Sequence, residues 1–177
     1  MTTTEQNWID EVGKPAYDAI AEMVAALQAD RERLEELREE RDGYDPDDYA
    51  EFQPGDKQAV ELWAERFPDE AEELTELEAA VKLDGEEVDE ETARERIEED
   101  PLSLRIFGER TGGEWEATSY ELLLGTGGPA VRFVGDLDGD GATSARLEVQ
   151  DWFKPWTEYP ADEDVLLTYA GCFYMGE

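Results

Sequence analysis

A loop of alternating aspartates, Asp136-Leu-Asp138-Gly-Asp140-Gly141, has the opening pattern of a calcium-binding loop. Aspartates at loop positions 1, 3 and 5 and glycine at position 6 place carboxylate oxygens around a sharp turn, as in an EF-hand. The bidentate acid that should follow at position 12 is missing, since Leu147 stands there and Glu148 comes one residue late. The flanking segments also have strand patterns, whereas an EF-hand loop joins two helices. We therefore favour a hairpin turn and keep a calcium or magnesium site as an alternative.

The side chains that most enzymes need for catalysis are absent or scarce. No histidine is present, which removes the commonest general base, the Ser-His-Asp and Cys-His arrangements and most zinc sites. Pairs of carboxylates could do acid–base work, but 49 acidic residues among 177 make such pairs inevitable. The run Gly125-Thr-Gly-Gly128 lacks the Lys-Ser/Thr of a phosphate-binding loop, so it predicts a turn. We expect neither an enzyme nor a cofactor.

Acidic side chains are the main chemical resource of the chain. The 49 Asp and Glu face 15 Lys and Arg, which gives a formal net charge of −34. Solubility alone needs a magnitude of only about 2–8 in a small domain. The negative sign excludes direct binding to nucleic acid or to an anionic membrane, because both carry the same sign. We expect a basic protein partner, one that normally binds nucleic acid.

The densest acidic runs form a candidate partner-binding track on predicted helices. Carboxylates three or four residues apart project from one helix face about 5–6 Å from each other. A helix of about 26 residues is roughly 40 Å long, so it could offer a basic cleft a negative track of DNA-like length. The track consists of Glu35, Glu36, Glu39, Glu40, Asp45, Asp47, Asp48, Asp69, Glu70, Glu72, Glu73, Glu86, Glu87, Asp89, Glu90 and Glu91.

The negative charge also fits a solvated surface or a salt-adapted host. A charge run on a helix is usually a solvated face, and four arginines between Arg31 and Arg41 partly neutralise the first predicted helix. A halophilic host would also account for the excess acid and the ratio of 4 Lys to 11 Arg. In that case the protein is an acidic structural or assembly module, and it could form homo-oligomers through its helices.

The first part of the chain has helical patterns. Ile20, Leu27 and Leu34 are seven residues apart in a predicted helix from about residue 16 to 41, closed by Asp42-Gly43. A second seam contains Val60, Phe67, Leu74 and Val81, with Pro68 marking a kink or the first turn of a new helix. A third helix is predicted over 90–99, with Ala93 and Ile97 facing inward. Two such seams predict an antiparallel, coiled-coil-like helical hairpin.

The second part has strand patterns. Residues 120–124 and 130–134 flank the glycine run and predict a hairpin, and strands are also predicted around 102–106 and over 146–150. A last helix is predicted from about Asp162 to Tyr174. The fold class is therefore α+β. An acidic helical region over 1–100 precedes a small antiparallel sheet with a C-terminal helix over 101–177.

The surroundings of the chain can also be predicted from composition. A single cysteine, Cys172, excludes an intramolecular disulfide scaffold. The N-terminus lacks the basic and apolar regions of a signal peptide, and no segment has the ~20 apolar residues of a membrane span. We expect a cytoplasmic protein without a membrane segment.

Several segments of the last third resemble a family of small acidic proteins encoded by bacterial phages and plasmids. They are 100–104, 121–132, the run Asp151-Trp-Phe-Lys-Pro-Trp-Thr-Glu-Tyr159, 164–169 and 173–177. The resemblance extends over about 99–177 and is only compositional before that. The resemblance implies that a mobile element encodes the protein. Acidic DNA mimics that inhibit restriction or CRISPR nucleases recur in such elements, and the resemblance transfers no catalytic residue.

Trp115, Trp152 and Trp156 are candidate interface aromatics.

Overall fold

The computed structural model describes residues 3–45, 55–139 and 141–175 and divides the chain into two compact units. Unit 1 consists of Met1–Val24 and Glu91–Glu177, and unit 2 of Ala25–Glu90. The fold is mixed helix and sheet, as the sequence predicted, with 47% of the described residues helical and 27% in strands. In the described ranges, no helix has the length and apolar character needed to cross a bilayer.

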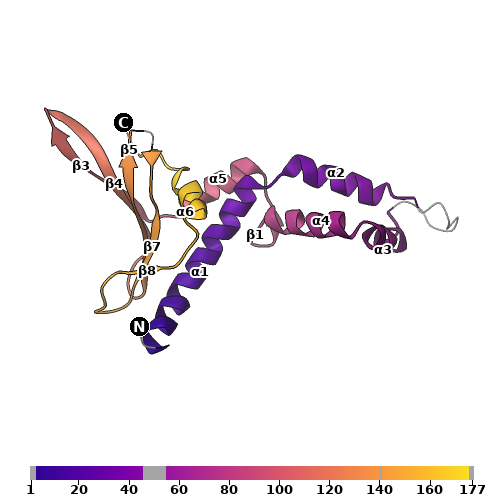
Figure 1. Ribbon diagram of the computed structural model, residues 1–177, viewed down its shortest axis with the longest axis horizontal. Coiled ribbons are helices and arrows are strands. Elements are labelled where there is room, and N and C mark those ends of the chain that lie inside the picture. The colour runs from indigo at the N-terminus through magenta and orange to yellow at the C-terminus, as the bar shows by residue number, and fades with distance from the viewer. Residues whose placement is uncertain (1–2, 46–54, 140, 176–177) are drawn as a thin grey trace. The chain divides into compact units, whose positions relative to one another are not determined.

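The sheet of unit 1 is antiparallel, with strand order β3-β4-β5-β7-β8 (Figure 1). Its strands are β3 (Ser103–Thr111), β4 (Glu114–Gly125), β5 (Ala130–Asp138), β7 (Arg146–Gln150) and β8 (Thr157–Tyr159), and the short β6 (Gly141–Ala142) pairs with β5. The predicted hairpin around the glycine run is confirmed, with Leu122 opposite Phe133. The strand predicted over 146–150 is β7.

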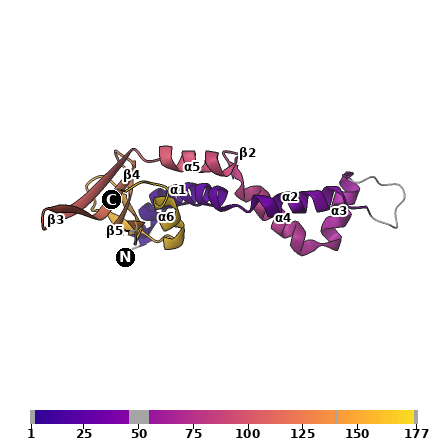
Figure 2. The same cartoon turned by 90° about the horizontal axis from the view of Figure 1, so that it is seen from above.

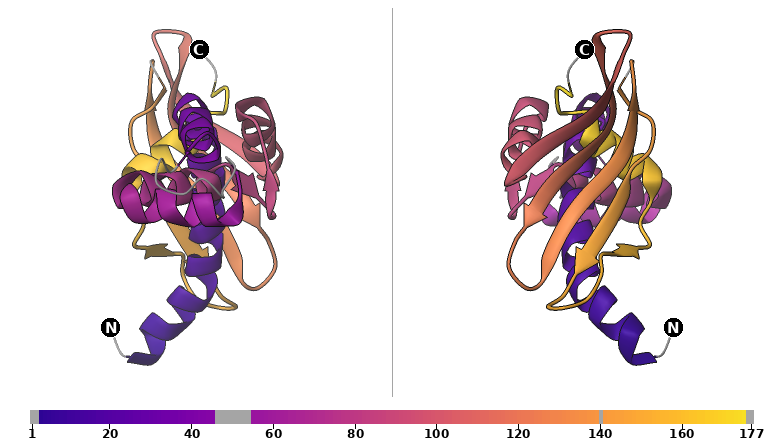
Figure 3. Two further views of the ribbon diagram at one scale, coloured as in Figure 1. Left: turned by 90° about the vertical axis from the view of Figure 1, so that its right-hand side faces the viewer. Right: turned by 90° about the vertical axis from the view of Figure 1, so that its left-hand side faces the viewer.

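Helices cover one face of this sheet and leave the other without a helix of unit 1 (Figure 3). They are α1 (Thr3–Gln28), whose first part belongs to unit 1, α5 (Glu90–Glu99) and α6 (Glu163–Ala170). On the covered face Phe133 stacks against Tyr169 of α6, with ring centroids 5.0 Å apart. The Tyr169 hydroxyl donates to Asp100 Oδ2 at 2.5 Å, which fixes α6 to the chain that follows α5.

Unit 2 contains α2 (Arg31–Asp42), α3 (Lys57–Arg66), α4 (Pro68–Ala80) and the two-residue strands β1 (Lys82–Leu83) and β2 (Glu86–Glu87). Figure 2 shows α2 and α4 next to each other, with α3 beside them. Their core consists of Leu34, Leu37, Trp63, Leu74 and Val81. The rings of Phe67 and Tyr44 pack edge to face, with their centroids 5.9 Å apart.

The helix predicted over 16–41 is wrong as one continuous helix, although its predicted end at Asp42-Gly43 is confirmed. The first helix starts at Thr3 and ends at Gln28, and a second one begins at Arg31. Asp30 caps the second helix, because its side chain accepts a hydrogen bond from the Arg33 N–H at 3.0 Å. The break separates two residues of the predicted seam, so that Ile20 is buried in unit 1 and Leu34 in unit 2.

Other predictions hold or need a smaller correction. The third helix has the predicted bounds and buries Ala93 and Ile97, and Pro68 begins a new helix as its first residue. The last helix ends at Ala170, four residues early, where Gly171 donates its N–H to Leu167. The sequence placed one boundary between residues 100 and 101, whereas the first 24 residues and most of α5 group with the sheet.

Candidate functional site

The predicted acidic track lies mainly in unit 2. Asp47 and Asp48 fall outside the described residues, and Glu91 belongs to unit 1. All other track residues are exposed except Glu70 and Glu73, which are half-buried. Unit 2 has 25 acidic and 7 basic residues in its sequence, a net charge of −18 over 66 residues. Unit 2 therefore carries −18 of the net charge of −34 in 66 of the 177 residues.

Arginines of α2 hold the elements of unit 2 together. Arg33 bonds both oxygens of Glu73 on α4, at 3.1 and 3.0 Å. Arg38 bonds Glu87 of β2 at 3.1 and 2.8 Å. Arg41 bonds Glu78 of α4 at 3.2 Å. These cations therefore link secondary-structure elements, and they also pair with three carboxylates of α2 itself, Glu35, Glu36 and Asp42.

A fourth arginine of α2 caps backbone groups. Arg31 donates to the carbonyl oxygens of Ala26 at 2.6 Å, Ala29 at 3.2 Å and Val88 at 3.1 Å. Its guanidinium therefore donates its hydrogen bonds to neutral carbonyl oxygens.

The hydrogen bond from Arg38 holds the pKa of the Glu87 carboxyl below its ordinary value, and nearby positive charges add to this effect. Glu87 is thus ionised at neutral pH.

Carboxylates that point away from the core of unit 2 form one short row on α2 and one on α4. Helical geometry places Glu32, Glu36 and Glu39 on the side of α2 opposite its buried Leu34 and Leu37. The matching row on α4 is Asp69, Glu72 and Glu76, opposite the buried Leu74. All six side chains are exposed. Because the two helices bury their inner faces against a common core, their outer rows face opposite ways.

This arrangement corrects the size of the predicted track. A continuous helix of about 26 residues would have carried charge over roughly 40 Å. The observed α2 has 12 residues and α4 has 13, so each extends roughly 18–20 Å. At a rise of about 3.4 Å per base pair, each helix has the length of five or six base pairs. The structure therefore has two short rows of carboxylates, one on α2 and one on α4, in place of one long track.

The aspartate loop is a hairpin turn, as favoured. Asp138 pairs with Gly141 across β5 and β6. The Asp136 carboxylate accepts a hydrogen bond from the Ser144 hydroxyl at 2.9 Å, so one of its oxygens already has a partner. Within the described residues no three acidic or cysteine side chains are grouped to hold a metal ion, and Asp140 lies outside them.

Sequence reasoning missed a ladder of charges on the helix-free sheet face. Glu121 is 5% exposed. It accepts from Arg105 Nε at 2.9 Å and from Arg132 Nη1 at 2.6 Å. Arg132 also bonds Glu148 at 2.8 Å and stacks on Trp156, with Cζ 4.2 Å from the ring centroid. Burial opposes the charged form of Glu121, but the two arginines outweigh it and lower its pKa.

The candidate interface tryptophans differ in exposure. Trp156 is half-buried over Arg132, whereas Trp115 is 58% and Trp152 63% exposed. Phe153, next to Trp152, is fully exposed and has φ of +64°. Cys172 is half-buried, and burial raises the pKa of its thiol, as expected of a packed and unreactive cysteine.

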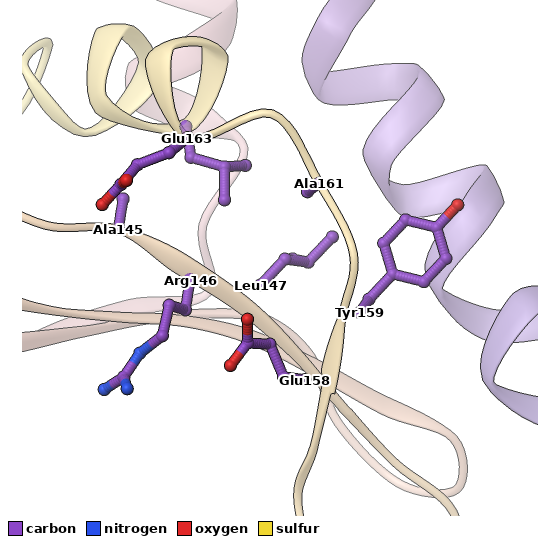
Figure 4. A pocket seen from close by; sticks show the side chains of 8 residues that line it. Ala145, Arg146, Leu147, Glu158, Tyr159, Ala161 and Glu163 are labelled. Atoms are coloured by element: carbon purple, nitrogen blue, oxygen red, sulfur yellow. The ribbon is translucent and has the colours of Figure 1, made fainter. Parts of the chain in front are cut away.

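A shallow cleft of about 260 Å³ opens where α6 meets β7 and β8. Leu147, Tyr159 and Leu166 supply apolar wall, Arg146 and Glu158 come from the paired strands, and Glu163 comes from α6 (Figure 4). Its charged groups are exposed. It contains no nucleophile with an adjacent base, so its lining does not indicate catalysis.

Comparison with known proteins gives no relative. No protein-family model matches the chain, and neither a curated protein nor a solved structure matches it. The resemblance of the last third to small acidic phage and plasmid proteins therefore stays a prediction.

Proposed function

We propose that the protein binds a basic, nucleic-acid-binding protein through the carboxylate rows of unit 2 and thereby occupies its nucleic-acid site. In this proposal it acts as a binding inhibitor with no catalytic step. The observation that carries the proposal is the use of the arginines. They link α2 to α4 and β2, and of the six carboxylates in the two outer rows only Glu36 is paired with one of these arginines.

The geometry favours a partner that contacts both rows. Each helix with its side chains is about 10–12 Å wide. The rows therefore lie on opposite sides of the pair formed by α2 and α4, which is about two helices thick. Neighbouring carboxylates in a row are about 5–6 Å apart, against a rise of about 3.4 Å per phosphate along one DNA strand. A positively charged cleft that normally encloses a nucleic acid fits this arrangement better than a flat basic surface.

The experiment compares the salt dependence of binding among matched variants. A partner is captured from host lysate at low salt, purified and titrated with the wild type between 50 and 200 mM salt. We expect the affinity to fall steeply as salt rises and duplex DNA to compete for the partner. Both effects follow if the carboxylates bind where the partner normally binds phosphates. A partner whose affinity ignores both salt and DNA would overturn the proposal.

Matched triple variants separate the rows from general charge. Removing one row, by Glu32→Gln, Glu36→Gln and Glu39→Gln or by Asp69→Asn, Glu72→Gln and Glu76→Gln, should weaken binding by roughly tenfold. The control neutralises three exposed carboxylates of unit 1, Glu95, Glu98 and Glu99, and should change binding by less than about threefold. Equal losses in all three variants would show that only total charge matters.

A specific observation favours a second candidate, an acidic structural or assembly module of a halophilic host. Unit 1 carries 24 acidic and 8 basic residues, so its net charge of −16 is nearly that of unit 2. Charge that is spread over both units suits adaptation to salt. This candidate, in which coiled-coil-like association of the helices is also proposed, predicts a fold that requires molar salt.

A third candidate, calcium binding by the aspartate loop, has the simplest test. If Asp136, Asp138 and Asp140 hold a cation, chelator should lower the melting temperature. An unchanged melting temperature, in the presence and absence of added calcium, would remove this candidate.

A further inference from the structure

The outermost strand of the sheet has a long free edge. Among the described residues, β3 pairs with β4 alone, and it has nine residues, whereas the opposite edge strand β8 has three. An edge strand presents unpaired N–H and C=O groups that can accept another strand. Short edge strands protect a sheet from this pairing, and β8 is short but β3 is not.

Two of the residues that commonly block an edge are absent from β3. The segment Ser103–Thr111 contains neither proline nor lysine. A bulge lies between β3 and β4, where Phe107 pairs with Ser119 and Gly108 with Ala117. The residue without a partner is thus Thr118 of β4. The backbone of β3 is regular along its free side, and a second strand can follow it without a gap.

The order of side chains on β3 is complementary to itself. If two β3 strands pair antiparallel with Phe107 opposite Phe107, then Arg105 of each copy lies opposite Glu109 of the other. These three residues alternate along the strand and share one sheet face. Directly opposite side chains have Cβ atoms about 4.5–5.5 Å apart. One register therefore gives two ion pairs and one aromatic pair.

Exposure and local charge support the same register. Phe107 is 46% exposed, and the Arg105 side chain is 61% exposed although it bonds Glu121. The strand carries two arginines and one glutamate, in a chain whose net charge is −34. Repulsion between copies is screened beyond about 8 Å at physiological salt. Because β3 itself carries no negative surplus, it adds nothing to the repulsion that a second copy meets at this edge.

We propose that two copies of this chain associate through their β3 edges into one continuous antiparallel sheet, with the two-fold axis beside Phe107. This interface lies outside the carboxylate rows of unit 2. It makes each assembly bivalent toward a basic partner if the proposed function also holds.

Charge changes at position 107 test the register, because this residue faces itself across the axis. Phe107→Lys alone and Phe107→Glu alone each place like charges opposite each other, and each should weaken dimerisation at least tenfold. An equimolar mixture should restore a dimer that contains one copy of each variant. Sedimentation gives the mass relative to the 20.0 kDa of one chain, and native mass spectrometry identifies the mixed species. Phe153→Lys, the same change at another exposed aromatic, should leave the dimer intact.

Disulfide trapping provides an independent test that does not depend on the charged variants. In a Cys172→Ser background, Phe107→Cys should form a cross-linked dimer under mild oxidation, since opposite residues of paired strands have Cα atoms within disulfide range. Phe153→Cys should not cross-link at the same rate. A wild-type protein that is monomeric at all concentrations, a mixture that stays monomeric, or equal cross-linking from both positions would each overturn the proposal.

Discussion

Glu121 is the residue whose removal should destabilise unit 1 most directly through electrostatics. Its carboxylate is buried between Arg105 and Arg132, and both of its oxygens accept hydrogen bonds from them. Glu121→Ala leaves the half-buried Arg132 with fewer partners, which should lower the free energy of unfolding by about 2–3 kcal/mol. Urea denaturation measures this change. Glu114→Ala, at an exposed carboxylate of the same strand, should stay within about 0.5 kcal/mol of the wild type.

The contribution of Glu121 should also depend on pH with a defined sign. Its folded pKa is lower than the ordinary value of 4.5, so the unfolded chain takes up the proton first as pH falls. The stabilisation is therefore fully present above pH 4.5 and is lost as pH falls through the folded pKa. We expect the stability difference between wild type and Glu121→Gln to shrink between pH 6 and pH 3. A constant difference over that range would contradict an ionised Glu121.

This ladder shows why the sequence alone did not reveal the main polar feature of unit 1. Arg132 and Glu148 alternate with apolar residues and are typical of a solvent-facing strand side. Whether they pair depends on strand register, which places Arg132 opposite Glu148 and Arg105 opposite Glu121. Register is set by contacts between distant segments, so no local pattern reports it.

At the scale of elements, Gly13 positions α1 against β8. A Cβ added at residue 13 would lie 2.2 Å from Cδ2 and 2.5 Å from Cγ of Tyr159. Replacing glycine by alanine within a helix normally stabilises it by up to about 1 kcal/mol. Here Gly13→Ala should instead destabilise the protein by about 1–2 kcal/mol, because the ring or the helix must move.

A double-mutant cycle checks the cause of this sign. In a Tyr159→Ala background the obstacle is gone, so Gly13→Ala should stabilise by about 0.5–1 kcal/mol, as helix propensity alone predicts. A destabilising effect of the same size in both backgrounds would show that α1 does not rest on Tyr159.

A glycine at position 153, in the loop between β7 and β8, should stabilise the folded protein. Phe153 has φ of +64° and a fully exposed side chain whose ring lies 6.4 Å from that of the exposed Trp152, so the ring contributes little while its Cβ strains the backbone. Phe153→Gly should raise Tm by about 2–4 °C, the effect of roughly 1 kcal/mol in a chain of this size. Phe153→Ala removes the ring but keeps the Cβ, so its Tm should stay near that of the wild type. A fall in Tm for Phe153→Gly would mean that the ring packs in solution.

Elements with complete local signals could be predicted, and those decided by tertiary contacts could not. The helix over 90–99 and the strand over 146–150 were predicted with correct bounds, and Pro68 correctly marked a helix start. The prediction of one seam through Ile20 and Leu34 was wrong. A spacing of seven shows at most that two residues could share the face of one helix. It does not show that they share a core, and these two belong to different units.

At the scale of the whole molecule, the partner-binding candidate and the salt-adapted candidate predict different stability curves. A net charge of −34 destabilises the folded chain through self-repulsion, which salt screens. The Debye length falls from about 30 Å at 0.01 M to about 10 Å at 0.1 M salt and about 3 Å at 1 M. Most of the repulsion between the outer rows is therefore screened by a few tenths molar salt.

Thermal unfolding in a sodium chloride series should show that difference. If the charge is directed at a partner, we expect the protein to be folded in 10 mM salt, with Tm rising up to about 0.3 M and changing little above it, since only screening acts. A salt-adapted chain should be unfolded in 10 mM salt and gain stability steadily into the molar range. Potassium chloride provides a control, because screening depends on ionic strength and not on the cation. A steady rise beyond 1 M in both salts would contradict the mimic proposal and favour the acidic assembly module.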